Sequence, residues 1–150
     1  FKSTDRGNNW TQINNGLNSL ETNVLAVDPN DSDVLYLGTD DDGIYKSING
    51  GENWKKLIPT ASFGVGDIAV DPENSKNVYM GTVDYFRLSE SRGVLGDFGV
   101  YKSTDGGTTW EEFNSGLNHL GVFSLELSEE NRILYAGTRA GGVYWINLDS

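Results

Sequence analysis

One stretch of the sequence, VDYFRLSESRGVLGDFG at positions 83–99, gathers residue types that bind ligands. Aromatic rings offer large contact areas with a polar edge, and arginine donates paired hydrogen bonds to carboxylates. We therefore expect a binding surface for a protein or a glycan, joined by two charged residues from other parts of the chain. The candidate ligand-binding residues are Tyr85, Phe86, Arg87, Glu90, Arg92, Arg139 and Asp67. In an alternative interpretation, Phe86, Leu88 and Leu95 only pack this stretch onto its neighbours.

Metal and cofactor chemistry has little support. The chain has no cysteine and one histidine, His119, which excludes disulfides and thiolate sites and leaves no basis for a histidine zinc site. The run Asp40, Asp41 and Asp42 is a weak candidate for Ca²⁺, because it lacks the spaced oxygen ligands of a calcium loop. We interpret it as a solvated acidic turn and His119 as an exposed polar residue. No cofactor is predicted.

Composition narrows the fold and the partners. Glycine supplies 19 of 150 residues and aromatic residues 11%, which favours an all-β chain with many tight turns. The formal charge of −11 repels phosphate backbones and anionic membranes, so nucleic acid is not an expected partner. No apolar run approaches the roughly 20 residues that cross a bilayer, so membrane insertion is not expected either.

A repeat organises the chain. The octets STDRGNNW, SINGGENW and STDGGTTW begin at Ser3, Ser47 and Ser103, and the segments between them also recur. Each unit holds four strand-like segments separated by Asp-Pro, Gly-rich or Asn-Gly turn signals, which is typical of a β-propeller blade. The prediction is a β-propeller of four-stranded antiparallel blades, with about three blades present. The expected divisions are the tail of a preceding blade at 1–20, a blade at 21–60, a blade at 61–117 and an incomplete last blade at 118–150.

The octets are interpreted as structural turns between the third and fourth strands. An aspartate there accepts hydrogen bonds from turn amides, the glycine takes a positive φ, and the tryptophan packs inward. Asn49 replaces the aspartate in the middle copy, and an amide cannot act as an acid or a base. The structural residues are Ser3, Asp5, Gly7, Trp10, Ser47, Asn49, Gly51, Trp54, Ser103, Asp105, Gly107 and Trp110.

The pattern Ser-x-Asp-x-Gly-x-x-Trp resembles the Asp-box, or BNR repeat, of sialidases, sortilin-type receptors, xyloglucan hydrolases and photosystem II assembly-factor-like propellers. The resemblance covers nearly the whole chain, since the segments AVDP, LYLGT and GIYKS also resemble bacterial members of that group. It implies that the boxes lie on the face away from the ligand site. It also implies an extracellular or periplasmic location.

The ligand face should carry the loops that join the second strand of a blade to the third, and those that join the fourth strand to the next blade. The threonine and tyrosine that flank this loop lie six positions apart in two units but 19 apart at Thr82 and Tyr101, an insertion of 13 residues. Loops longer than the repeat requires are common places for function. Asp67 begins an innermost strand on the same face. Asp28 and Asp71, each before a proline, are interpreted as turn residues on the opposite face.

Two functions remain open at this point. The preferred one is a non-catalytic binding or scaffold module, because the units are regular and only one loop departs from the pattern. The alternative is a glycoside hydrolase. The sialidase-like form would use Arg87, Arg92 and Arg139, although the Arg-Ile-Pro motif is absent. The xyloglucanase-like form would need two carboxylates from different blades, for which Asp67 and Asp97 are possible.

The number of strands bears on assembly. About thirteen strands make just over three blades, whereas closed propellers usually have four to eight. We expect the remaining blades to come from the same longer chain, as part of a propeller of roughly six to eight blades. The alternative is a homo-oligomer, in which a second copy closes a ring of about six blades.

Overall fold

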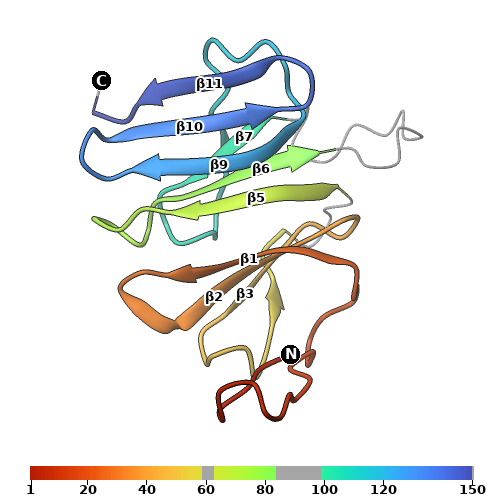
Figure 1. Cartoon of the computed structure of the whole chain (residues 1–150). Helices are drawn as coiled ribbons and strands as arrows, with labels where there is room; N and C mark the ends of the chain where they lie inside the picture. The colour runs from red at the N-terminus through yellow and green to blue at the C-terminus, as the bar shows by residue number, and fades with distance from the viewer. Residues whose placement is uncertain (59–62, 84–98, 150) are drawn as a thin grey trace.

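The structure is a computed structural model that describes residues 1–58, 63–83 and 99–149. Its described residues form three antiparallel sheets and contain no helix, which confirms the all-β propeller prediction (Figure 1). The first blade contains β1 (Thr22–Asp28), β2 (Asp31–Thr39), β3 (Ile44–Ser47) and β4 (Lys55–Lys56), hydrogen-bonded in that order. The second contains β5 (Gly64–Val70), β6 (Val78–Val83), β7 (Val100–Ser103) and β8 (Glu111–Glu112). The third contains β9 (Val122–Ser128), β10 (Ile133–Thr138) and β11 (Gly142–Asn147).

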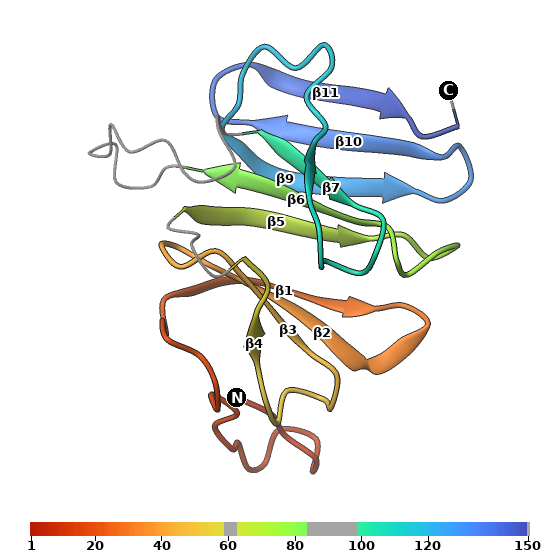
Figure 2. The same cartoon turned by 180° about the vertical axis from the view of Figure 1, so that it is seen from behind.

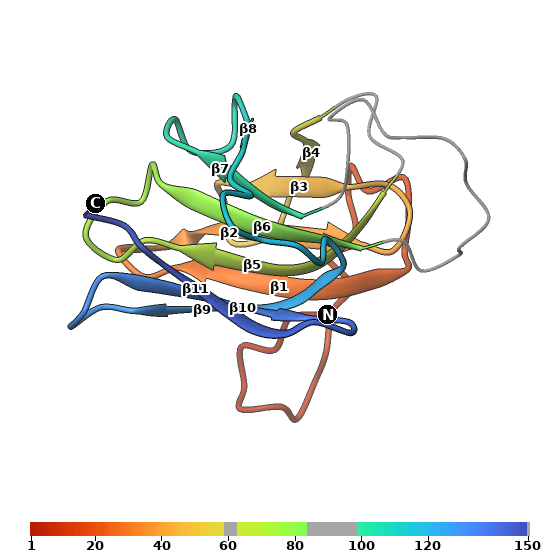
Figure 3. The ribbon, with the colours of Figure 1, turned by 90° about the horizontal axis from the view of Figure 1, so that it is seen from above.

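The blades stack face to face, with the two chain ends at opposite ends of the stack (Figure 1). The innermost strand β5 contacts β1 on one side and β9 on the other. Seen from behind, the outer strands β3, β4 and β7 come to the front (Figure 2). Seen from above, β4 and β8 lie on the side away from β1 and β5 (Figure 3). Each blade therefore presents two broad faces to its neighbours.

The hydrophobic core lies between the blades. Strand β6 is buried along its whole length, because blades cover both of its faces. One cluster joins the first and second blades and includes Tyr36, Ile44, Val65 and Ile68. A second cluster joins the second and third blades and includes Tyr79, Val100, Val122, Leu125 and Leu134.

Two glycines of the repeated Gly-Thr pair permit this close packing. A Cβ atom on Gly38 of β2 would lie 2.7 Å from the Cβ of Val65 in the next blade. A Cβ atom on Gly81 of β6 would lie 2.6 Å from Cγ1 of Val122. Both distances are far below van der Waals contact. The segments LYLGT and VYMGT therefore need glycine because the first strand of the next blade approaches the sheet there.

The loops divide between two faces of the stack. The β1–β2, β5–β6 and β9–β10 turns lie together on the left of Figure 1, and β6 and β10 end on the right. We call the right-hand side the loop face. It carries the connections from β2 to β3, from β6 to β7 and from β10 to β11.

Candidate functional site

The three octets fold into one kind of turn. The first residue donates from its hydroxyl to the third residue, at 2.9 Å in Ser3–Asp5, Ser47–Asn49 and Ser103–Asp105. The third residue then accepts from a backbone amide four positions later, at 2.8 to 3.0 Å. Asn49 makes this bond with its amide oxygen. The turn thus needs an oxygen acceptor and not a negative charge.

Hydrogen bonds within the turn also stabilise the ionised carboxylates. The side chain and backbone amide of Thr109, followed by weaker donors, lower the pKa of Asp105 to about 2. Bonds from the side chain and backbone of Asn9 lower the pKa of Asp5 in the same way.

The octet turns also connect neighbouring blades. The amide of Gly106 donates to the carbonyl of Lys76 within its own blade, at 2.9 Å. The carbonyl of Gly106 accepts from Lys46 Nζ of the preceding blade, at 2.9 Å. In the first blade, the carbonyl of Gly50 accepts a hydrogen bond from Lys2 Nζ at 3.2 Å. These contacts support the interpretation of the octets as structural turns.

The expectation that each octet tryptophan packs inward is wrong for Trp10. Trp54 is 7% exposed, and its indole Nε1 donates to the carbonyl of Ile13 at 2.7 Å. Trp110 is partly buried and donates to Gly107. Trp10 is 62% exposed, because no described residue lies in the position that the segment around Ile13 occupies beside Trp54.

On the loop face, a threonine closes each connection. Thr39 Oγ1 donates to the carbonyl of Gly43 at 2.9 Å, and Thr138 Oγ1 donates to that of Gly142 at 3.0 Å. Thr82 Oγ1 makes the same bond to Gly99 at 3.0 Å and accepts from its amide at 2.9 Å. The long connection therefore leaves and re-enters the blade through the same closed geometry as the short ones.

Several predicted residues lie in that long connection. Tyr85, Phe86, Arg87, Glu90, Arg92 and Asp97 fall outside the described residues.

The other two predicted ligand residues are not brought together. Asp67 is partly buried, and its Oδ2 accepts from the amide of Leu125 in the third blade at 2.8 Å. Arg139 is exposed, and its amide donates to the carbonyl of Gly121 at 2.9 Å. The structure shows no hydrogen bond or ion pair between Asp67 and Arg139. Asp67 acts between blades, while Arg139 stands at the rim of the loop face.

The acidic turn at Asp40, Asp41 and Asp42 contains an ion pair. Asp42 binds Lys56 and accepts from the hydroxyl of Tyr45. Burial opposes ionisation of Asp42, but the hydrogen bonds from Lys56 and Tyr45 outweigh it and lower its pKa. Burial and the bond to Asp42 raise the pKa of Tyr45. Within the described ranges, no group of three or more His, Cys, Asp or Glu side chains could hold a metal ion.

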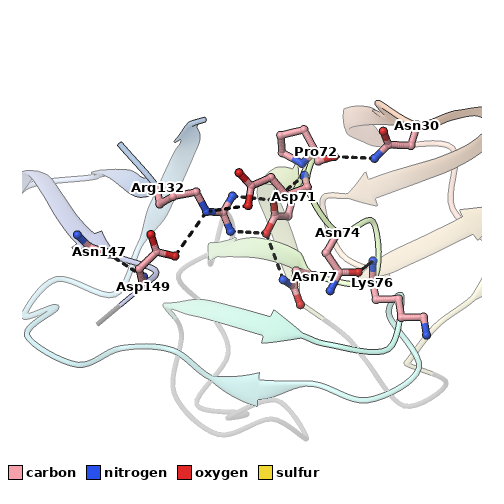
Figure 4. Close-up of polar contacts among 10 residues, drawn as sticks. Asn30, Asp71, Pro72, Asn74, Lys76, Asn77, Arg132, Asn147 and Asp149 are labelled. Atoms are coloured by element: carbon pink, nitrogen blue, oxygen red, sulfur yellow. Dashed lines mark hydrogen bonds and ion pairs between the residues drawn. The ribbon is translucent and has the colours of Figure 1, made fainter. Parts of the chain in front are cut away.

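Sequence reasoning missed an ion pair between blades. Asp71 accepts from the amide of Glu73, as a turn residue should, but Arg132 of the third blade also binds it through both terminal nitrogens at 2.8 Å (Figure 4). Asp71 is fully buried. The Arg132 bonds, partly opposed by burial, lower its pKa to about 2. Arg132 lies in the turn between β9 and β10 with a positive φ of 49°, which is uncommon for a residue other than glycine.

The corresponding position in the second blade has the same role. Ser75 lies four residues after Asp71, as Arg132 lies four after Ser128, and its hydroxyl donates to Asp28 of the first blade at 2.6 Å. This shared spacing is the signal that could have identified Arg132. His119, expected to be exposed, is exposed, and its Nδ1 lies 3.0 Å from the Tyr144 hydroxyl.

Comparison with known proteins agrees with a propeller built on Asp-boxes. A family model described as "Sortilin-Vps10: Sortilin, neurotensin receptor 3" matches residues 1–143. The chain therefore belongs to the Sortilin-Vps10 family.

Curated relatives are named as xyloglucanases. Xyloglucanase Xgh74A of Acetivibrio thermocellus is 31% identical over 140 residues, which cover 83% of this chain and 16% of the relative. A xyloglucanase of Paenibacillus sp is 28% identical over 180 residues, covering 100% of this chain and 17% of the relative. The chain thus spans about a sixth of the length of these relatives.

A solved structure agrees with the propeller fold and with the relationship to xyloglucanases. The GH74 enzyme of Niastella koreensis superposes with a TM-score of 0.64 at 26% identity, covering 83% of this chain and 19% of that one. In the described part of the chain, no helix is long and apolar enough to cross a membrane.

Proposed function

We propose that this chain binds a glycan of the xyloglucan type through its loop face, as a group of propeller blades. The observation that carries the proposal is its 31% identity with a xyloglucanase, together with one long connection on that face. Thr82 and Gly99 hold both ends of this connection against the blade. A polysaccharide needs an extended surface with exposed donors and aromatic rings, and Arg139 stands exposed on the same side.

Hydrolysis of the same polymer is the second candidate, favoured by the xyloglucanase names of the relatives. Glycoside hydrolysis ordinarily needs one carboxyl group as an acid and another as a base or a nucleophile. Asp67 is engaged with Leu125, and Asp42 is paired with Lys56. We therefore propose binding as the function of this chain. Hydrolysis would require Asp97 together with a second carboxylate.

The proposed ligand also bears on location. A plant-type polysaccharide is too large to pass through a membrane, so a protein that binds it must meet it outside the cytoplasm. We propose an extracellular or periplasmic location. The absence of cysteine is compatible with either compartment.

Affinity electrophoresis in xyloglucan gels tests the proposal. The chain should be retarded by xyloglucan, and a variant lacking residues 85–96 should lose the retardation while keeping its β-sheet circular dichroism. Arg139→Ala should weaken binding several-fold. Arg6→Ala, an exposed arginine in the first octet, is the matched control and should bind normally.

The same samples separate the two candidates. If the chain releases reducing ends from xyloglucan and Asp97→Asn abolishes this release, hydrolysis becomes the proposed function in place of binding alone. A folded chain that neither binds nor hydrolyses xyloglucan would refute both candidate functions.

A further inference from the structure

A groove of about 390 Å³ lies between the octet turns of the first and second blades. One wall comes from β3, β4 and the octet that joins them, and the other comes from the octet of the second blade. Strands β3 and β4 lie on the side away from β1 and β5 (Figure 3). Because the octets join the third strand of a blade to the fourth, the groove lies away from the loop face. The side chains that line it include Lys46, Ile48, Asn49, Lys55, Leu57 and Asp105.

Two lysines face this groove from directly opposite positions on neighbouring strands. Lys46 of β3 pairs with Lys55 of β4, so both side chains leave the same face of the sheet. The equivalent pair in the second blade is Lys102 with Glu111. Like charges at directly opposite positions destabilise a sheet, whereas opposite charges stabilise it. The first blade therefore carries an unfavourable charge pair where the second carries a favourable one.

No carboxylate offsets the two lysines among the described residues. Lys46 Nζ donates to the carbonyl of Gly106 at 2.9 Å and lies 4.9 Å from the centre of the Tyr36 ring, and both of these groups are neutral. Lys55 is exposed, and its side chain forms no ion pair within the described ranges. The groove thus holds two positive charges that an anionic ligand would neutralise.

The middle octet adds a hydrogen-bond donor to the same groove. Asn49 Oδ1 accepts from the hydroxyl of Ser47 and from the amide of Asn53, and Asn49 Nδ2 donates to no described residue. In the last octet the corresponding atom is Oδ2 of Asp105, which accepts from the hydroxyl of Thr109 at 2.7 Å. Asparagine therefore keeps the turn and replaces a negatively charged oxygen with a free donor.

The apolar part of the groove favours a peptide over a sugar. Ile48 is 73% exposed and stands ready to contact an apolar side chain. Trp54 also lines the groove but is 7% exposed, and its indole donates to Ile13, so it offers no open ring on which a sugar could stack. Acidic peptide motifs are commonly recognised by clusters of basic residues.

We propose that this groove binds an acidic peptide segment of a partner protein, in which a carboxylate side chain neighbours an apolar one. The carboxylate binds between Lys46, Lys55 and Asn49, and the apolar side chain contacts Ile48. The charge of Asp105 on the facing wall is already stabilised by hydrogen bonds within its own turn. Since the site lies away from the loop face, it does not depend on the proposed xyloglucan binding.

The overall charge acts against this partner at long range. The chain carries a formal charge of −11, which repels an acidic peptide at low ionic strength. At about 0.15 M salt the Debye length is about 8 Å, so distant carboxylates are screened while the two lysines contact the ligand directly. Binding should therefore be measured at that ionic strength.

Fluorescence anisotropy with a labelled Leu-Glu-Leu-Glu-Leu peptide tests the proposal. The chain should bind it about 10-fold or more tightly than the neutral Leu-Gln-Leu-Gln-Leu peptide with the same label. Lys55→Glu should raise Kd for the acidic peptide about 10-fold or more, because a repulsive charge replaces an attractive one. This variant copies the Lys102–Glu111 pair, so it should not lower the melting temperature. Arg6→Glu makes the same charge change at an exposed arginine outside the groove and should leave Kd unchanged.

A second variant tests the donor in the middle octet. Asn49→Asp should raise Kd several-fold without destabilising the chain, because Asp5 and Asp105 form the same turn. Equal binding of the two peptides, or an unchanged Kd in Lys55→Glu, would overturn the proposal. A galacturonate oligomer that binds the groove more tightly than the acidic peptide would also overturn it, because the occupant would then be an acidic glycan. Lys55→Glu should keep its retardation by xyloglucan, so failure of either proposed binding site can be recognised separately.

Discussion

The contact between the first and second blades and the contact between the second and third use the same positions of the repeat with different chemistry. At the first contact, Ser75 donates one hydrogen bond to Asp28. At the second, Arg132 makes a bidentate ion pair with Asp71. Ser75 and Arg132 occupy equivalent places in the turn after the innermost strand. The repeat therefore fixes where the contact is made, and the residue at that place decides how strong it is.

The difference between the two contacts corresponds to the presence or absence of an octet in the later blade. Across the first contact, Lys46 also donates to Gly106 in the octet of the second blade. The third blade has no octet, and the equivalent Lys102 keeps only ring contacts, with Tyr79 at 5.9 Å and Phe113 at 5.2 Å, as Lys46 also lies 4.9 Å from the ring of Tyr36. Among the described residues, the second contact has no equivalent of the outer hydrogen bond from Lys46, and its inner contact is a bidentate ion pair. We interpret the arginine as compensation for the missing octet.

Removing the arginine should have the largest effect. Arg132→Ala leaves the Asp71 carboxylate buried without its cation, which should lower the free energy of unfolding by about 3 kcal/mol in urea titrations. Amide exchange should accelerate in β9–β11 more than in β1–β4. Arg132→Lys should recover only part of the loss, because lysine cannot bind both oxygens in the same plane. Equal exchange in all three blades would contradict a local role for this pair.

Acid should weaken the second contact next. Asp71 has a pKa of about 2 in the folded protein against an ordinary 3.8, so the unfolded chain takes up a proton first as pH falls. The pair therefore stabilises the fold above about pH 4, and about 2 kcal/mol is lost as pH falls toward 2. Unfolding measured from pH 6 to pH 2 should show the difference between the natural chain and Arg132→Ala shrinking. A constant difference would show that Asp71 does not titrate with the pair.

The first contact should be less sensitive. Ser75→Ala removes one hydrogen bond to a buried carboxylate and should cost about 1.5 kcal/mol. Asp28 keeps its bond from the amide of Asn30, so the loss is smaller than at Asp71. Ser32→Ala, the same change at the equivalent exposed position of the first blade, is the matched control for thermal unfolding. If Ser75→Ala and Arg132→Ala lower the free energy of unfolding by similar amounts, the two contacts do not differ in strength as proposed.

The smallest effect is expected at the outer bond. Lys46→Met keeps the apolar stem of the side chain but removes the donor to Gly106, and should cost about 0.5 kcal/mol. Lys102→Met is the control without this bond. Both lysines lie over aromatic rings, so the additional loss in Lys46→Met measures the octet bond, and a larger loss from Lys102→Met would contradict its contribution.

Much of the fold was accessible from the repeat alone. Blade order, strand order within each blade and the turn made by Ser47 and Asn49 depend on local pattern, which recurs and can be aligned. The contact of Asp71 with Arg132 was not predicted, since the two residues lie 61 positions apart and Asp-Pro already explained the aspartate as a turn residue. Trp10 was predicted wrongly for a related reason. Its burial depends on what lies beside the blade.

The candidate site divides in the same way. The length of the connection after Thr82 is a property of the sequence, and it located the departure from the repeat. The role of Asp67 is not, because a carboxylate at the start of a strand can face a ligand or a neighbouring strand. Its bond to Leu125 across the blade contact is decided by packing.

The sequence by itself determined the blade, because turn chemistry and strand alternation act over a few residues and repeat with the octets. Only the tertiary structure decided which side chains join one blade to the next. Those contacts depend on the stacking of faces from separate units, so that Gly81 must be small and Arg132 must reach Asp71.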